Sequence, residues 1–183
     1  MSESYEVAFE SGDTFPQFLA KPLTNKAFWE AVYKRAIVAD ELIERVAALH
    51  GDWRLLVLNE DWCGDSVNII PYLAKLDDAI PTLEMRVIRR DENLEIMDEH
   101  LTGNSRSIPV VILLDKEFKE CGWWGPRPSE LQRWVIDEGL KLSKEDRYKQ
   151  VRTWYARDRG ATTMMEIVSM LEGCITARVG KPH

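Results

Sequence analysis

The sequence lacks an excess of positive charge, long apolar runs and closely spaced metal ligands, and each absence excludes a class of protein. The 183 residues carry 24 Lys and Arg against 31 Asp and Glu, a formal net charge of -7. Nucleic acids and anionic membrane surfaces are bound through clustered positive charge, so we expect neither as a partner. The apolar runs, such as residues 110–114, are far too short to span a bilayer.

The amino terminus and the cysteines both bear on location. Residues 1–6 contain neither the basic region nor the apolar stretch of a secretory signal peptide, so we expect a cytoplasmic protein. The three cysteines, an odd number at long spacings, favour a reducing compartment over a disulfide framework. The three histidines lie far from one another and from the cysteines, so the pattern contains no zinc spacing and we expect no metal or other cofactor.

The chain does contain enough apolar residues, 45%, for one globular domain with a substantial core. Apolar positions recur every three or four residues over 25–49, which predicts one long amphipathic helix. Runs of Leu, Val and Ile at 53–58 and 110–114 predict strands that are buried on both faces of a sheet. Residues 83–89 alternate as a third strand, and 118–124 return as an antiparallel partner.

Helical spacing resumes between and after these strands, which predicts an α/β domain. Helices are expected at residues 64–76, 93–101 and 129–140, and in two stretches after Ser143 that meet near Gly160. We divide the chain into an irregular lead-in (1–24), an α/β domain (25–140) and a helical extension packed on the domain (141–183).

The segment Trp62-Cys63-Gly64-Asp65-Ser66 is the candidate site, because it follows a predicted buried strand and opens a predicted helix. The partial positive charge and free N–H groups of a first helical turn stabilise a thiolate, which is the nucleophilic form of cysteine. Gly64 leaves room for a partner, and the Ser66 hydroxyl can donate a hydrogen bond to the Cys63 sulfur. We therefore expect Cys63 to be a reactive thiol rather than a small buried apolar residue.

Four landmarks make the chain resemble the thioredoxin superfamily over roughly residues 25–140. They are Trp62-Cys63-Gly64 after the first central strand, Pro71 eight residues beyond Cys63, Ile108-Pro109 before a strand, and Gly125 sixteen residues beyond Pro109. The motif and the tail 154–160 also resemble a bacterial branch with Trp-Cys-Gly-Asp-Cys. The resemblance implies a three-layer α/β/α sandwich with a mixed central sheet, a cis bond before Pro109 and thiol–disulfide exchange.

The resemblance also implies a substrate groove beside Cys63. The backbone of Ile108, next to Pro109, would pair with an extended substrate segment. We accordingly expect substrate contacts at Trp62, Gly64, Asp65, Ile108 and Pro109. Because side chains alternate along a strand, one of Trp123 and Trp124 is expected to face outward and the other to pack in the core.

The chain departs from the family pattern at the second cysteine. Ser66 stands there, and a hydroxyl cannot attack a mixed disulfide, so the intramolecular dithiol cycle is excluded. The buried acid that moves protons for that cysteine is replaced by Val57. Cys121 and Cys174 have no comparable context and are expected to fill the core.

The acidic neighbours of Cys63 are a further departure. Asp65 replaces the usual proline, and with Glu60 and Asp61 it is expected to surround the thiol with negative charge. This charge opposes the helix terminus, so the pKa of Cys63 can lie on either side of its ordinary value.

Two functions of different classes follow from these residues. In the first, Cys63 and Ser66 form a single-thiol (CxxS) site, and Cys63 makes mixed disulfides with a protein thiol or disulfide or with a low-molecular-weight thiol such as glutathione. In the second, the Ile108-Pro109 groove belongs to a redox-silent protein-binding module. Two more readings remain: Ser66 as a replacement for cysteine in a dithiol oxidoreductase, and an iron–sulfur carrier, for which no basic glutathione contacts are found.

Overall fold

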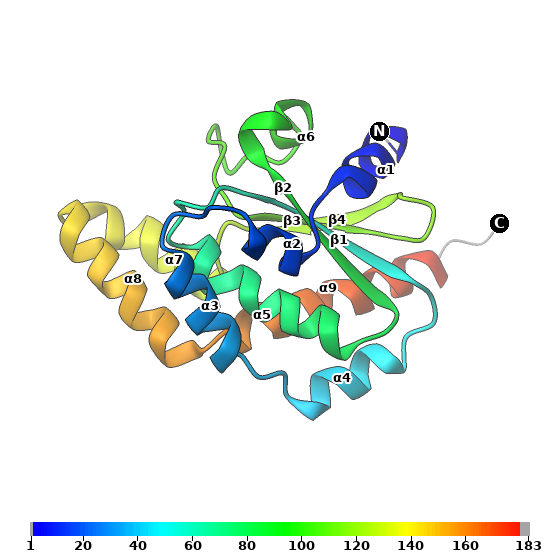
Figure 1. Ribbon diagram of the computed structural model, residues 1–183. Coiled ribbons are helices and arrows are strands. Elements are labelled where there is room, and N and C mark those ends of the chain that lie inside the picture. Colours follow the sequence, from blue (N-terminus) through cyan, green and yellow to red (C-terminus); the bar gives the residue numbers. More distant parts are fainter. Residues whose placement is uncertain (1, 180–183) are drawn as a thin grey trace.

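A four-stranded mixed sheet forms the centre of the computed structural model, which describes residues 2–179 (Figure 1). Its strands are β1 (Trp53–Asn59), β2 (Leu83–Arg89), β3 (Val110–Leu114) and β4 (Glu120–Trp124). The order across the sheet is β2-β1-β3-β4, with β1 and β2 parallel and the other two pairs antiparallel. The strand predicted at 118–124 is shorter because Phe118 has a left-handed backbone, with φ of 56°, and belongs to the turn before β4.

Helices cover both faces of this sheet, so the molecule has three layers, as predicted (Figure 1). Helices α1 and α6 lie on one face, and α3, α5 and α9 lie on the other. The helices are α1 (Ser2–Ser11), α2 (Phe15–Ala20), α3 (Lys26–Arg35), α4 (Asp40–Ala47), α5 (Ser66–Ala79), α6 (Leu94–Asp98), α7 (Ser129–Asp137), α8 (Lys144–Asp158) and α9 (Ala161–Val179), with short 3-10 turns η1 (Arg90–Glu92) and η2 (Gly139–Lys141).

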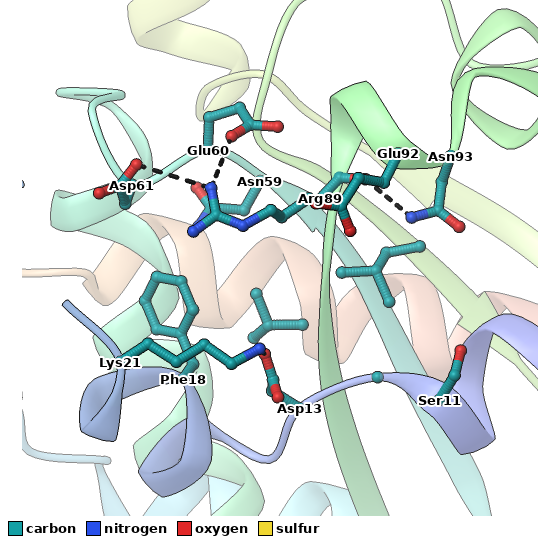
Figure 2. A pocket seen from close by; sticks show the side chains of 13 residues that line it. Ser11, Asp13, Phe18, Lys21, Asn59, Glu60, Asp61, Arg89, Glu92 and Asn93 are labelled. Atoms are coloured by element: carbon teal, nitrogen blue, oxygen red, sulfur yellow. Dashed lines mark hydrogen bonds and ion pairs between the residues drawn. The ribbon is translucent and has the colours of Figure 1, made fainter. Parts of the chain in front are cut away.

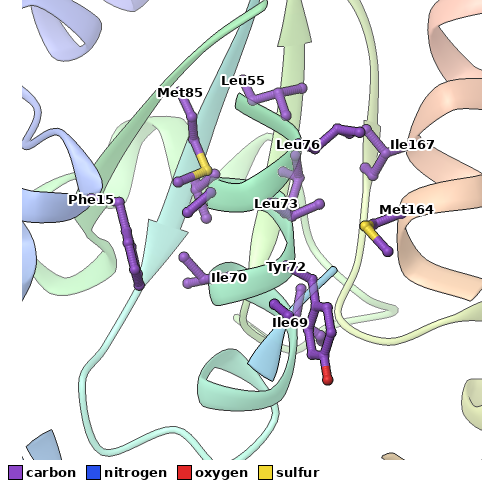
Figure 3. Close-up of a cluster of buried hydrophobic side chains, with 14 of the residues drawn as sticks. Phe15, Leu55, Ile69, Ile70, Tyr72, Leu73, Leu76, Met85, Met164 and Ile167 are labelled. Atoms are coloured by element: carbon purple, nitrogen blue, oxygen red, sulfur yellow. The ribbon is translucent and has the colours of Figure 1, made fainter. Parts of the chain in front are cut away.

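The larger core lies between the sheet and α5 (Figure 3). Alternate strand residues such as Leu55 and Met85 point to this side, where they meet Leu73 and Leu76 of α5 and Ile167 of α9. These side chains are almost fully removed from solvent, so this layer supplies much of the apolar burial that stabilises the fold.

The smaller core lies on the opposite face, under α1 and α6. Leu56 and Leu58 point to it because side chains alternate along β1. They pack with Phe9 of α1 and Met97 of α6, and Cys63 belongs to the same cluster. The nucleophile candidate is therefore attached to the smaller core.

Ionisable groups are also buried in this smaller core. The Nδ1 atom of His100 lies 2.6 Å from the carbonyl oxygen of Ile96, and its Nε2 lies 3.3 Å from a carboxylate oxygen of Glu120. The Tyr5 hydroxyl donates to the same oxygen over 2.6 Å. Both ring nitrogens face acceptors, which fits a protonated, positively charged His100 paired with Glu120.

The region before β1 differs from the prediction in two ways. The lead-in expected to be irregular contains α1 and α2, and α2 begins with a capping box in which Thr14 and Gln17 bond each other's backbone. The long helix expected over 25–49 is two helices, because the backbone turns extended at Ala36 and Ala39. The break lets α3 pack on α5 while α4 packs on α9.

The cysteines expected to fill the core separately are instead joined. Cys121 on β4 and Cys174 on α9 form a disulfide, with Cα atoms 5.5 Å apart and a sequence separation of 53. Helix α9 crosses the edge strand and brings the two together, which residue spacing alone cannot show. Within residues 2–179, no helix combines the length and apolar character needed to cross a membrane.

Candidate functional site

Cys63 lies in the turn between the end of β1 and the start of α5. Its backbone N–H donates to the carbonyl oxygen of Glu60 over 3.1 Å, and its carbonyl accepts from Val67 over 3.3 Å. The Sγ atom lies 3.5 Å from the carbonyl oxygen of Ile108. This contact brings two parts of the expected site together. The Ile108–Pro109 bond is cis, as predicted.

The Cys63 side chain is free but only 8% exposed, whereas an exposed, acidic loop was expected. The loop folds its sulfur onto Ile108 and the smaller core, so the expectation of a polar setting was wrong. Burial raises the pKa of the Cys63 thiol, the nearby Ser66 hydroxyl lowers it, and the Asp65 charge raises it. Burial dominates, so the resting group is a thiol.

Ser66 occupies the first turn of α5 and is fully buried. Among the described residues its Oγ has no hydrogen-bond partner while Cys63 is a thiol. The hydroxyl nevertheless lowers the pKa of Cys63, because it can donate to a thiolate. The Ser66 hydroxyl can therefore donate a hydrogen bond to Cys63 once the sulfur is ionised.

The Asp65 carboxylate has two hydrogen-bonding partners, Arg127 and Tyr155, that the sequence did not predict. Its carboxylate accepts from Arg127 Nε over 3.0 Å and from Arg127 Nη2 over 2.5 Å. The buried Tyr155 hydroxyl donates to the same carboxylate over 2.9 Å. The negative charge at this position is therefore paired with Arg127, although it still raises the pKa of Cys63.

These partners come from the loop after β4 and from α8, both distant in sequence. Burial and the charge of Asp65 raise the pKa of Tyr155 well above its ordinary value, so the phenol stays a donor. Tyr155 lies in the tail segment 154–160 noted in the sequence, which was the available signal. Arg127 follows the second cis bond, Gly125–Pro126, and no sequence pattern singled it out.

The other two acidic residues, Glu60 and Asp61, are held by an arginine of β2 (Figure 2). Arg89 Nη1 lies 3.1 Å from Glu60 and 3.8 Å from Asp61. Burial raises the pKa of Asp61. Hydrogen bonds from Thr24 and the charge of Arg89 together lower this pKa by more, so it lies below its ordinary value. A pocket of about 320 Å³ opens beside them, with the Asp13–Lys21 ion pair on its other side.

Trp62 and Gly64 present the outer side of the motif. Trp62 is 56% exposed, with the Arg90 guanidinium 5.4 Å from its ring centre. A Cβ atom added to Gly64 would meet no other atom within 4 Å, so this side of the loop is open. Both positions are available to a partner that approaches Cys63.

Glycine is required at position 125 by the loop that carries Pro109. An added Cβ atom would lie 2.2 Å from the Pro109 carbonyl oxygen, and φ is +141°. The preceding tryptophans alternate as predicted: Trp123 packs edge-on against His100, and the Trp124 indole donates to Glu166 of α9 over 2.6 Å.

The described part of the chain contains no group of three or more His, Cys, Asp or Glu side chains arranged to hold a metal ion.

Comparisons with solved structures give the fold. A protein of unknown function from Pseudomonas aeruginosa superposes with a TM-score of 0.75 at 22% identity, over 92% of this chain and 97% of that one. An HIV epitope scaffold superposes with a TM-score of 0.73 at 21% identity, over 92% and 98%. No curated protein matches the chain.

The comparison with family models identifies the family as well as the fold. Residues 12–149 match the family described as Thioredoxin. The match takes in the Cys63 motif, Ile108-Pro109 and Arg127, and it spans well over half of the 183 residues. The chain therefore belongs to the thioredoxin family.

Proposed function

We propose that this protein is a cytoplasmic thiol–disulfide exchange protein in which Cys63 is the single nucleophile. One observation carries the proposal: a free thiol lies at the start of α5, 3.5 Å from the Ile108 carbonyl, beside a buried serine hydroxyl that has no other partner among the described residues. That hydroxyl and the first-turn N–H groups stabilise the thiolate more than the thiol, and so favour the reactive form.

The reaction proceeds by two exchanges. The Cys63 thiolate attacks one sulfur of a substrate disulfide, an S–S bond to Cys63 forms, and the substrate S–S bond breaks to release a thiolate that takes up a proton. Ser66 cannot resolve this intermediate. A second thiol, from glutathione or from a cysteine of the partner, then attacks as its thiolate at the substrate sulfur of the mixed disulfide. A new S–S bond forms to that sulfur, the bond to Cys63 breaks, and Cys63 leaves as a thiolate that takes up a proton.

The residues around Cys63 suggest how the substrate is held. The backbone N–H of Ile108 makes no hydrogen bond within residues 2–179, and an extended segment beside Pro109 can use it. Trp62 and Gly64 flank the approach to the sulfur. Asp65 acts as a positioning residue, because its ion pair with Arg127 and its hydrogen bond from Tyr155 hold the loop next to Cys63 in place.

The burial of Cys63 favours a second candidate, a redox-silent protein-binding module. At 8% exposure and with a raised pKa, the thiol is a slow nucleophile unless a partner uncovers it. In that case the Ile108–Pro109 loop and Trp62 bind a polypeptide without covalent chemistry.

Mass-mapped trapping separates the two candidates. The protein is incubated with oxidised glutathione, digested without reductant, and compared with a Cys63→Ser control. We expect a glutathione adduct on Cys63 that glutathione removes, and alkylation of Cys63 in the native protein ahead of Cys121 and Cys174, which are bonded to each other. Failure to form the adduct in the native protein, while the denatured protein forms it, would contradict the nucleophile proposal and leave the binding module as the better candidate.

A variant tests the role of Ser66. Coupled to a thioredoxin-reductase system, the unmodified chain should not turn over insulin disulfides, whereas Ser66→Cys should gain activity because a second thiol can then resolve the intermediate. Ser66→Ala is the matched control and should remain inactive. Turnover by the unmodified chain would mean that another thiol resolves the intermediate.

A further inference from the structure

A solvent-open groove of about 730 Å³ lies between α1 and the η1–α6 segment. Helices α1 and α6 lie on the same side of the sheet (Figure 1). Four of its lining residues are acidic and none is basic; they are Glu3, Asp91, Glu92 and Glu95. Asp91 is paired with Arg90, but Glu3, Glu92 and Glu95 form no ion pair within residues 2–179. An adjoining hollow adds Glu99 to the same acidic wall.

The groove also has an apolar strip. Val7 on α1 is 65% exposed and Leu94 at the start of α6 is 38% exposed, and they stand on the two walls. Ala8 and Ile96 line the groove as well but are buried at 6% each, so its floor is apolar and firmly packed. An apolar strip bordered by unpaired charge of one sign is typical of a recognition surface.

The groove continues toward the Cys63 motif. Ser11, Glu92 and Asn93 line both this groove and the pocket of Figure 2, whose other wall includes Glu60 and Asp61. Those two residues directly precede Trp62 and Cys63 in the chain. An occupant of the groove would therefore lie next to the loop that carries the thiol.

We propose that this groove binds a basic amphipathic helix of a partner protein. Apolar side chains three and four residues apart would pack on Val7 and Leu94, and Lys or Arg on the flanks would pair with Glu3 and Glu95. The walls are themselves helical segments, α1 and η1–α6. The inference does not depend on the reactivity of Cys63.

The probe is a synthetic, fluorescein-labelled helix built from Leu and Lys with Leu at positions i, i+3, i+4 and i+7, titrated with the full chain and followed by anisotropy. The groove variant is Glu92→Lys with Glu95→Lys, and its matched control is Glu41→Lys with Glu44→Lys, an exposed pair of the same spacing on α4. We expect the groove variant to weaken binding about 10-fold or more, and the control less than about 3-fold.

Two further arms test the apolar strip and the thiol. Val7→Gln, which removes the apolar contact without adding charge, should weaken binding of the peptide. A scrambled peptide of the same composition should bind poorly, and Cys63→Ser should bind like the unmodified chain. Equal weakening by the two charge-reversal pairs, or equal binding of the scrambled peptide or of spermine, would overturn the proposal. Concentration-dependent self-association abolished by the groove variant would replace it with a second copy of this chain as occupant.

Discussion

The two faces of the sheet differ in what they bury. On the face that carries α3, α5 and α9, the core consists almost entirely of apolar and aromatic side chains, and its buried ionisable groups include Tyr155, whose hydroxyl donates to Asp65. On the face under α1 and α6, the core is smaller. It contains His100, which is 1% exposed and lies 3.3 Å from Glu120. Cys63 belongs to this second, mixed core.

The two cores therefore differ in what they contribute: the larger mainly stabilises the fold, and the smaller also holds groups that can take part in chemistry. Burial of apolar side chains is the main favourable term in folding, and the larger core supplies most of it. Buried ionisable groups cost free energy unless they are paired, and proteins tend to keep them where they serve a function. The smaller core is accordingly the place where substitutions should alter chemistry as much as folding.

The sharpest test truncates neighbouring leucines of β1. Leu55 and Leu56 are both fully buried, but they point to opposite faces. We expect Leu55→Ala to lower the free energy of unfolding by about 4 kcal/mol and Leu56→Ala by about 2.5 kcal/mol, because α1 can settle into the cavity left by Leu56. Urea denaturation of both variants measures the difference. Equal losses would show that the smaller core is packed as rigidly as the larger.

The second prediction breaks the ion pair of the smaller core. Burial lowers the pKa of His100, but hydrogen bonds to Glu120 and Ile96 raise it more, so it lies above its ordinary value. The hydrogen bond from His100 lowers the pKa of Glu120, against burial. Glu120→Gln should lower the free energy of unfolding by about 2 kcal/mol, reduced from the cost at a fully buried site because Glu120 is partly exposed.

The effect of Glu120→Gln should depend on pH with a definite sign. The raised pKa of His100 stabilises the fold at low pH and loses its contribution as pH rises through the folded value. The lowered pKa of Glu120 stabilises the fold above its ordinary value and is lost on acidification. The gap between the two proteins should thus be widest between about pH 4.5 and 6.5 and narrow on either side. Tyr5→Phe, which keeps the pair, is the control, and a gap independent of pH would contradict a charged His100.

The third prediction changes the pKa of Cys63 through substitutions that lie outside the smaller core. Asp65→Asn removes a charge that raises the pKa of Cys63 and leaves Arg127 uncompensated nearby, so the pKa should fall by about one unit. Arg127→Gln should raise it. Alkylation rate against pH, with Cys121 and Cys174 replaced by serine, gives both values. Shifts of the same sign in the two variants would mean that altered packing, not charge, controls the thiol.

The smallest effect is expected at the margin of the larger core. Burial raises the pKa of Asp77 to about 6, so the folded protein binds a proton there that the unfolded chain releases, and stability falls as pH rises through this range. Asp77→Asn keeps an oxygen to accept from Met85 and should raise the free energy of unfolding by about 1 kcal/mol at pH 8 and by almost nothing at pH 4. Thermal melts at both pH values measure it. A gain at pH 4 as large as that at pH 8 would mean that the charge is not the cause.

Sequence alone was sufficient for three of the four strands and for the cis bond next to Cys63. The runs at 53–58, 83–89 and 110–114 are dense enough in apolar or alternating residues that β1, β2 and β3 fall within one residue of the predictions. The Ile108–Pro109 cis bond also followed from the family resemblance. These features depend on local patterns, which a single sequence carries.

Features that depend on tertiary contact could not be read in the same way. The Asp65–Arg127–Tyr155 cluster joins residues 62 and 90 positions apart, and its members resemble ordinary surface residues in the sequence. The break between α3 and α4 leaves the apolar period intact, because each half packs on a different helix. The burial of Cys63 follows from where the Ile108 loop lies, not from the polar residues next to it.

The Cys121–Cys174 bridge makes part of the chain a covalent loop. Helices α7 and α8, with Arg127 and Tyr155, lie inside its 53-residue span, so a proteolytic cut there would leave both pieces attached. Closing a loop of this length restricts the unfolded ensemble and contributes about 4 kcal/mol in the chain-entropy relation. The free energy of unfolding therefore depends on the thiol concentration around the protein, and reduction opens the covalent loop that contains the partners of Asp65.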